Sequence, residues 1–436
     1  MDVGEDHSRR VRAWIGVAAL TVLVAGVVYL RPSLTPPAAT GPHATGAALA
    51  PGSWTLGAVS FGDRDHGAVV LYRSGPAPIT TLGKDPSLTF LTSDGGRTWQ
   101  LVDRLGFGLA SFVDRRTLLL QTATGPGPPN TRLSHDGGHT WRRLMDPRRY
   151  PGLGLPDFLD AQHGWWLQRP PTADPPRTPS PVTLWRTTDG GRSWQRLAAS
   201  GLPETGFPAQ RVFVDPLRGA LIFNTFLDGS RSWLATTDAG DSWQVAKGPD
   251  TPLPGTWTMS VTLLKHGGRL LAWLQAVPGP PSPNGFAPTG TVTVAEFVSA
   301  SDDGGQTWGP PRAGPNIVKP TYVSLIPTLD DRGRLLLLDN GHLWVSADDG
   351  ATWTVRVAQM PAGLRPAWLV GAPPGGLIAT AFQTGSLGIM TQGTQLTLIR
   401  SVDGGAHWSP VSLPRPTDEI QRDRSSLPAP SSTATH

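Results

Sequence analysis

The amino-acid sequence predicts an all-β protein, a seven-bladed β-propeller, with one apolar transmembrane helix at its N-terminus. An eight-residue pattern that ends in tryptophan occurs seven times, at intervals of about 40 to 65 residues, and a propeller blade needs roughly 40–50 residues. The 52 glycines and 45 prolines among 436 residues interrupt the chain too often for long helices and suit short strands joined by turns. The chain therefore reads as a ring of similar four-stranded units.

The repeated pattern is Ser/Thr-x-Asp-x-Gly-x-Ser/Thr-Trp, and only its seventh copy departs, with His407 in the hydroxyl position. The Asp and Trp of the seven copies are Asp94 and Trp99, Asp136 and Trp141, Asp189 and Trp194, Asp238 and Trp243, Asp303 and Trp308, Asp348 and Trp353, and Asp403 and Trp408.

Each copy predicts a tight hairpin turn. The Asp carboxylate accepts hydrogen bonds from backbone N–H groups just ahead of it. The Gly two positions later supplies a positive φ. The hydroxyls tie the two flanks together, and the Trp covers the turn with its apolar face. Burial of such a side chain contributes roughly 1.5–3 kcal/mol to stability.

The spacing of the turns sets the number of blades at seven, because no interval between them is long enough for two blades. A second repeat, Phe-x-Asp-x-x-x-Gly, occurs at Phe61, Phe158 and Phe213, and its first half at Phe112. We interpret it as the turn between the first and second strands. Residues 53 to 93 then hold the first three strands of blade one, and only one strand fits after Trp408.

The N-terminal segment predicts the location of the protein. Ala13 to Leu30 carries no charge, and Arg9, Arg10 and Arg12 precede it. Eighteen helical residues extend about 27 Å, close to the ~30 Å hydrocarbon core. The positive-inside rule then keeps the first residues in the cytoplasm and exports the rest. We favour an uncleaved signal-anchor over a cleaved signal peptide, and both export the propeller.

These observations predict five segments. Residues 1–12 form a cytoplasmic tail, 13–30 the transmembrane anchor, and 31–52 a linker rich in Pro and Ala. Residues 53–413 form the propeller and 414–436 a disordered tail.

Composition excludes several function classes. The net charge is +4 and the basic residues are scattered without a run, so we expect no nucleic-acid partner. The chain has no cysteine, which excludes disulfides and thiolate metal sites. No cluster has metal-ligand spacing and no phosphate-binding loop occurs. We expect a monomer without metal or cofactor.

The seven turns resemble the Asp-box, or bacterial neuraminidase repeat, of sialidase-like propellers, sortilin-type receptors and photosystem II assembly factors. Together with the Phe-x-Asp element they look most like the assembly-factor type, over residues 53–413. The resemblance implies that each box joins the third and fourth strands of a blade, away from the active face, and that its aspartate is structural and not catalytic. The resemblance concerns the architecture and does not imply a photosynthetic role.

We expect function on the opposite face, where the long insertions fall between second and third strands: Ser74–Ser87, Arg169–Val182, Val277–Thr291 and Gln383–Thr394. Loops of variable length on a rigid scaffold commonly carry recognition, although such loops are also tolerated as passive insertions. The predicted function is non-catalytic binding of an unknown protein or cell-surface glycan. Candidate contacts are Tyr150, Trp257, Tyr322 and Trp368, although the packing role is favoured over the binding role for each.

The alternative is an exo-sialidase-like glycoside hydrolase. The resemblance then implies Tyr322 as nucleophile, with Glu204 in the position of its activating glutamate. Against this alternative, the chain lacks a Phe/Tyr-Arg-Ile/Leu-Pro motif, its arginine triad cannot be assigned, and known sialidase propellers have six blades. We therefore favour a protein without catalytic residues.

Overall fold

The computed structural model describes residues 54–73, 87–103, 107–123, 130–144, 156–168, 182–203, 207–224, 231–250, 256–278, 295–315, 327–339, 341–371, 375–383, 396–414 and 416. Among these residues, no helix has the length and apolar character needed to cross a bilayer. The predicted anchor at 13–30 lies outside the described residues, so it stays a prediction.

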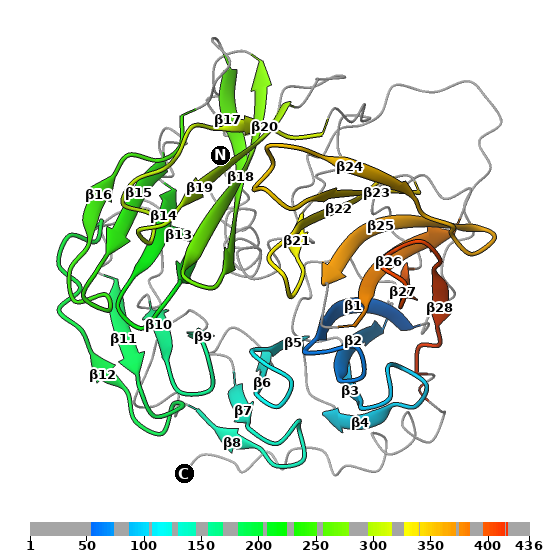
Figure 1. The fold of residues 1–436 in the computed structure, drawn as a ribbon. Helices are drawn as coiled ribbons and strands as arrows, with labels where there is room; N and C mark the ends of the chain where they lie inside the picture. Colours follow the sequence, from blue (N-terminus) through cyan, green and yellow to red (C-terminus); the bar gives the residue numbers. More distant parts are fainter. Residues whose placement is uncertain are drawn as a thin grey trace, which may run out of the picture.

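The described chain forms seven four-stranded antiparallel sheets arranged in a ring (Figure 1), which confirms the seven-bladed propeller. Blades 1 to 3 comprise β1 (Trp54–Phe61), β2 (Gly67–Arg73), β3 (Ser87–Thr92) and β4 (Gln100–Asp103); β5 (Phe107–Phe112), β6 (Leu118–Ala123), β7 (Asn130–Ser134) and β8 (Arg142–Arg143); and β9 (Pro156–Phe158), β10 (Gly164–Gln168), β11 (Thr183–Thr187) and β12 (Gln195–Arg196). Blades 4 and 5 comprise β13 (Phe207–Phe213), β14 (Gly219–Asn224), β15 (Arg231–Thr236) and β16 (Gln244–Ala246); and β17 (Thr256–His266), β18 (Arg269–Pro278), β19 (Ala295–Ser301) and β20 (Arg312–Ala313). Blades 6 and 7 comprise β21 (Thr328–Leu329), β22 (Leu335–Asp339), β23 (His342–Ser346) and β24 (Thr354–Val357); and β25 (Leu364–Gly371), β26 (Leu377–Gln383), β27 (Leu396–Ser401) and β28 (Ser409–Val411).

Every sheet follows the order of the chain, with its first strand near the centre of the ring and its fourth at the rim (Figure 1). The first blade is therefore wholly N-terminal and the seventh wholly C-terminal, as predicted. No sheet mixes the two ends of the chain, so side chains have to hold the ring closed.

The contact between blades 7 and 1 closes the ring by apolar packing and two hydrogen bonds. Leu71 packs in one buried cluster with Leu398. The indole Nε1 of Trp99 donates to the carbonyl of Ser412 at 2.8 Å, and Arg400 Nη1 donates to the carbonyl of Gly95 at 2.9 Å. Seven such apolar clusters of buried residues lie within the described part of the ring.

The second strands supply much of this packing because both faces of each sheet meet a neighbouring blade. All five residues of β10 are buried. Between blades 3 and 4, the ring of Trp165 stacks on that of Phe213, with centroids 3.5 Å apart, and its Nε1 donates to the carbonyl of Ala239 at 2.8 Å. A strand that is buried on both sides appears in the sequence as a continuous, mostly apolar run, as in the segment GWWLQ of β10.

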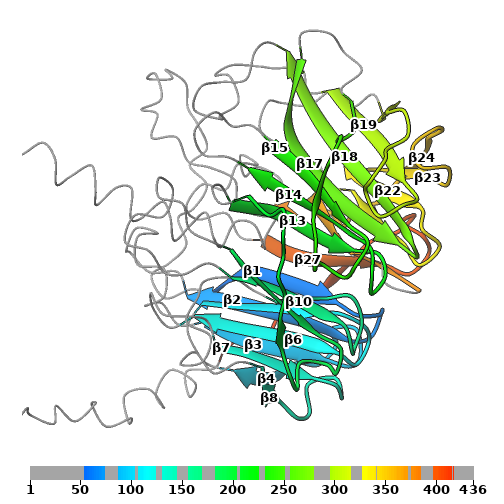
Figure 2. The same cartoon turned by 90° about the vertical axis from the view of Figure 1, so that its left-hand side faces the viewer.

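The two strands β17 and β18 form the longest hairpin, with 11 and 10 residues. They stand out as the longest arrows in the side view (Figure 2). Their register runs from Thr256 opposite Pro278 to His266 opposite Arg269.

Candidate functional site

Two kinds of turn meet on one face of the ring, which we call the Asp-turn face. One joins the first and second strands of a blade, and the other is the repeated Asp turn between the third and fourth strands. In blade 1, Gly95 N–H donates to the carbonyl of Asp65 at 2.8 Å, and equivalent bonds occur in blades 2, 3 and 4. The connections between second and third strands leave from the other ends of the strands, which we call the opposite face.

The seven Asp turns share one hydrogen-bond pattern. In blade 1, Asp94 Oδ1 accepts from the N–H of Thr98 at 2.9 Å and from Thr92 Oγ1 at 2.8 Å. Asp94 Oδ2 accepts from Thr98 Oγ1 at 2.6 Å. The same bonds recur at Asp136, Asp189, Asp238, Asp303 and Asp348, and at Asp403 the ring of His407 replaces the hydroxyl at 2.6 Å.

The backbone of each turn needs two left-handed residues, whereas the sequence predicted one. In blade 1 both Gly95 and Gly96 have positive φ, at 72° and 85°. Ala239 in blade 4 and Asp349 in blade 6 occupy the first of these positions, at 64° and 55°. The tryptophan packs over the second position, since a Cβ on Gly96 would lie 3.2 Å from the ring of Trp99.

The hydrogen bonds keep the turn carboxylates ionised. The hydroxyl and N–H of Thr98 lower the pKa of Asp94 to about 2. Burial of Asp189 opposes ionisation, but the bonds from Ser193 outweigh it and bring the pKa to about 2. A carboxylate with so low a pKa and with its oxygens occupied is unsuited to proton transfer near neutral pH. The Asp turns are therefore structural.

The turn between the first and second strands is a second aspartate turn. Asp63 Oδ1 accepts from the N–H groups of Asp65 and His66, and Asp114, Asp160 and Asp215 repeat this arrangement, as the Phe-x-Asp repeat predicted. Blade 6 uses Asp330 in the same way. The sequence missed it because Thr328 and Arg334 occupy the positions of the Phe and the Gly of the repeat.

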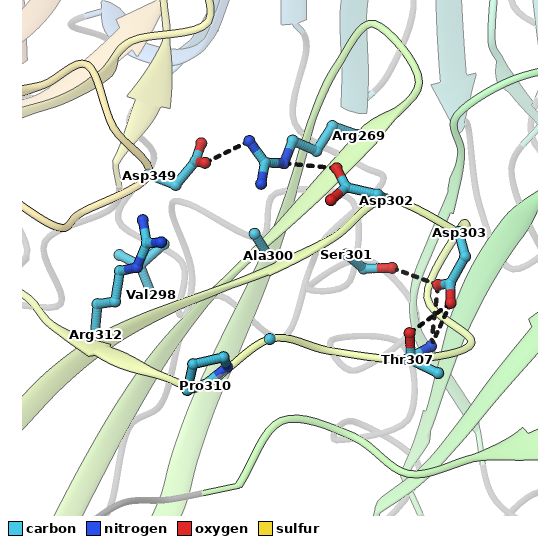
Figure 3. A pocket seen from close by; sticks show the side chains of 11 residues that line it. Arg269, Val298, Ala300, Ser301, Asp302, Asp303, Thr307, Pro310, Arg312 and Asp349 are labelled. Carbon is cyan, nitrogen blue, oxygen red and sulfur yellow. Dashed lines mark hydrogen bonds and ion pairs between the residues drawn. The ribbon is translucent and has the colours of Figure 1, made fainter.

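One hollow on the Asp-turn face, the clamped hollow, lies between blades 5 and 6 (Figure 3). Its volume is about 200 Å³. Arg269 lies between two carboxylates there, with Nε 2.8 Å from Asp302 Oδ1 and Nη1 2.5 Å from Asp349 Oδ2. Arg312 Nη1 donates to the carbonyl of Asp348 at 2.5 Å. Because the charges satisfy one another across the blade boundary, this hollow is a clamp between blades.

Charged groups also meet where blades 3, 4 and 5 face the centre of the ring. Arg211 Nη2 donates to the carbonyl of Trp165 at 3.0 Å, and Lys265 Nζ reaches the carbonyl of Leu159, two blades away, at 3.5 Å. Burial lowers the pKa of Lys265, and the nearby carboxylate of Asp157 partly offsets this. Lys265 is nonetheless exposed, so its ammonium group links blade 5 to blade 3 at the protein surface.

The predicted contact residues of the opposite face fall largely outside the described residues. Tyr150, Tyr322 and Glu204 all lie outside the described residues. Trp257 lies in β17 opposite Val277, without a described side chain. Trp368 lies in β25, half-buried in the cluster between blades 7 and 1, with its ring edge-to-face to Phe382 at 6.1 Å. The roles proposed for these residues stay predictions.

Buried polar groups, not anticipated from the sequence, lie in the strand halves toward the opposite face. Gln121 is 4% exposed, and its amide has no partner among the described residues. In blade 5, Ser260 Oγ donates to Gln275 Oε1 at 2.5 Å, and Gln275 Nε2 donates to Glu296 Oε1 at 3.1 Å. Glu296 is 7% exposed. Burial of amide and carboxylate groups costs free energy unless they find partners.

Within the described ranges, no group of three or more His, Asp or Glu side chains is placed to hold a metal ion.

Comparisons with known proteins give structural neighbours only. No family model and no curated protein matches the chain. A protein of unknown function from Dyadobacter fermentans is 11% identical, with a TM-score of 0.40, covering 80% of this chain and 96% of its own. An α-L-arabinanase of Penicillium chrysogenum is 11% identical, with a TM-score of 0.39 and coverages of 80% and 93%. An α-L-arabinofuranosidase of Fusarium graminearum is 9% identical, with a TM-score of 0.38 and coverages of 81% and 94%. No activity or ligand is transferred from them to this chain.

Proposed function

We propose that this protein is a membrane-anchored, extracytoplasmic binding scaffold of the Asp-box type, which captures a protein or glycan on its opposite face without catalysis. The observation that supports this proposal is the difference between the two ends of the same strands. At the Asp-turn face the turn carboxylates are occupied by local hydrogen bonds, as at Asp94. Toward the opposite face lie buried polar groups, such as Gln121 and Gln275, and the ends of the strands that the long connections join.

The strand ends define where those connections emerge. β2 ends at Arg73 and β3 begins at Ser87, and β10 and β11 are separated by residues 169–182. β18 and β19 are separated by residues 279–294. These connections leave the same face as the half of β18 that holds Gln275. A scaffold closed by apolar packing holds the strand ends that these connections join in a fixed arrangement around one rim.

The first and last strands of the ring also end on this side. β1 runs toward the Asp-turn face, so its first residue, Trp54, lies at the opposite face. β28 ends at Val411 on the same face. An anchor formed by residues 13–30 would therefore place this face near the membrane, where an envelope protein or glycan is available.

Replacement of two connections tests the binding function. In the full chain, residues 169–181 and 279–294 would each be replaced by a short Asn-Gly turn, which favours a tight hairpin. Crosslinking of the native membrane and capture should lose the partner in this variant. A control with Gln306→Ala, on the Asp-turn face, should retain it. Capture of the same partner by the shortened variant would reject the proposal.

Cysteine labelling tests the location, because the chain has no native cysteine. Val402→Cys places a thiol on an exposed position, 68% accessible. We expect a membrane-impermeant maleimide to label it in intact cells and to label Ser8→Cys only after permeabilisation. The reverse pattern would place the propeller in the cytoplasm.

A fluorogenic sialoside assay tests the proposal that the protein binds without catalysis. We expect no turnover by the full chain. Hydrolysis that disappears in Tyr322→Phe would establish the enzyme alternative.

A further inference from the structure

A second hollow on the Asp-turn face, between blades 2 and 3, has a volume of about 660 Å³. This lies within the range of roughly 300–1,000 Å³ of small-molecule sites. Four turns form its lining: Asp114, Arg115, Arg116 and Thr117 from the first turn of blade 2, His135 from its Asp turn, Ala161 and Gln162 from the first turn of blade 3, and Arg192 from its Asp turn. We call it the basic hollow.

The walls of the basic hollow are held by the same backbone bonds as the rest of the face. Gly137 N–H donates to the carbonyl of Arg116, and Gly190 N–H to the carbonyl of Gln162, both at 2.8 Å. The ring of His135 lies beside Gly190, since a Cβ there would be 3.1 Å from its Nε2. The hollow is therefore preformed rather than assembled on binding.

Its cations lack carboxylate partners within the described residues. Arg115, Arg116 and Arg192 are exposed, and none forms an ion pair there. Arg192 Nη1 donates only to the carbonyl of Asp189, at 3.4 Å. Asp114, the carboxylate among the described lining residues, uses Oδ1 for the N–H groups of its own turn.

A further arginine adds positive charge behind the hollow. Arg142 donates from Nη1 to the carbonyl of Gly191 at 2.8 Å and from Nη2 to that of Gly190 at 2.5 Å. Burial lowers the pKa of Arg142, the neighbouring charge of Arg192 lowers it further, and the nearby carboxylate of Asp189 offsets part of this. The two guanidinium groups thus repel each other, and a bound anion would relieve this repulsion.

The arginines in the first turns of blades 1 and 4 are paired instead. Arg64 pairs with Asp65 in blade 1, and Arg218 pairs with Asp215 in blade 4. The residue after the second left-handed position of the Asp turn also changes around the ring. It is Arg97, His139 and Arg192 in blades 1 to 3, but Asp241, Gln306, Ala351 and Ala406 in blades 4 to 7.

We propose that the basic hollow binds an anionic polysaccharide through its carboxylate or sulfate groups. Arginine guanidinium groups form paired, charge-assisted hydrogen bonds with such planar or tetrahedral oxyanions. The described lining holds no Phe, Tyr or Trp for base stacking, which disfavours nucleic acid. The site lies on the Asp-turn face, so this proposal does not depend on the function proposed for the opposite face.

Binding by the full chain in detergent tests the proposal, with heparin and polygalacturonate as probes and dextran as the neutral control. The test variant is Arg115→Gln with Arg116→Gln and Arg192→Gln. The control variant removes the same charge from exposed arginines elsewhere, Arg196→Gln with Arg332→Gln and Arg356→Gln. We expect the test variant to bind at least one acidic polysaccharide roughly tenfold more weakly, and the control to bind nearly as the parent.

Three results would overturn the proposal. One is no binding of either acidic polysaccharide by the parent chain. Another is an equal loss in the test and control variants, which would mean attraction by net charge alone. The third is tighter binding of a soluble anionic lipid headgroup, glycerol 3-phosphate, than of either polysaccharide, with the same dependence on the three arginines. Arg192→Lys alone, which keeps the charge, covers the case in which the triple variant fails to fold, and several-fold weaker binding is expected from loss of the planar fork.

Discussion

The clamped hollow and the basic hollow both lie where Asp turns of neighbouring blades meet, and they differ in whether their charged side chains are paired. In the clamped hollow Arg269 lies between Asp302 and Asp349. In the basic hollow Arg115, Arg116 and Arg192 have no such carboxylate among the described residues. The comparison teaches that the turn backbone is constant, whereas its variable positions decide whether a blade boundary stabilises the ring or offers charge to a ligand.

Acid should affect both hollows, and we expect this to be the largest effect because all the Asp turns respond together. The hydroxyl and N–H of Thr98 hold the pKa of Asp94 at about 2, and those of Thr352 do the same for Asp348. A lowered folded-state pKa contributes stability that is complete above the unfolded pKa of about 4 and is lost as pH falls through the folded value. The Tm should be level from pH 7 to about 5 and fall steeply between about 4 and 2. A level Tm down to pH 2 would contradict the role given to these carboxylates.

Removal of one turn carboxylate should cost the same at either hollow. Asp303→Ala and Asp189→Ala each leave N–H and hydroxyl donors without their acceptor. We expect each to lower the free energy of unfolding by about 1–3 kcal/mol, measured by denaturant titration. A large difference between the two variants would show that the turns are not equivalent scaffolds.

Loss of a single arginine should separate the hollows. Arg269→Gln leaves Asp302 and Asp349 without their shared cation, and we expect a loss of about 1 kcal/mol, since the pair is partly exposed. Arg192→Gln should change stability by less than about 0.5 kcal/mol, because its guanidinium pairs with no described carboxylate. Equal losses in both would remove the distinction between clamp and binding hollow.

The smallest expected effect is that of Asp349→Asn. Asparagine tolerates the left-handed φ of 55°, so the substitution removes charge from the clamp while keeping the turn. We expect a loss of about 0.5 kcal/mol at low salt that vanishes near 1 M salt. A loss that persists at high salt would indicate that shape, not charge, sets the contribution of Asp349.

The sequence predicted the ring well because its signal is local. The carboxylate of Asp94 finds its partners at Thr92 and Thr98, within four residues, so an isolated segment already contains the whole turn. The same holds for Asp63 and its bonds to Asp65 and His66. The turn at Asp330 was missed because it makes the same hydrogen bonds without the Phe and the Gly by which the repeat is recognised.

The contacts between blades could not be predicted in this way. The carbonyl that Arg312 meets belongs to Asp348, 36 residues later in the chain, and Trp99 meets Ser412 across 313 residues. No spacing rule indicates that Trp165 stacks on Phe213, or that Gln275 and Glu296 meet inside blade 5.

By itself the sequence determined the number of blades, the place of every Asp turn and the strand order, because each depends on hydrogen bonds and strand pairing between residues close in the chain. Only the tertiary structure decided which charged side chains meet at each blade boundary. The geometry of the ring brings the turns of two neighbouring blades together. Whether an arginine meets a carboxylate there, as Arg269 does and Arg192 does not among the described residues, depends on side chains that are far apart in the sequence.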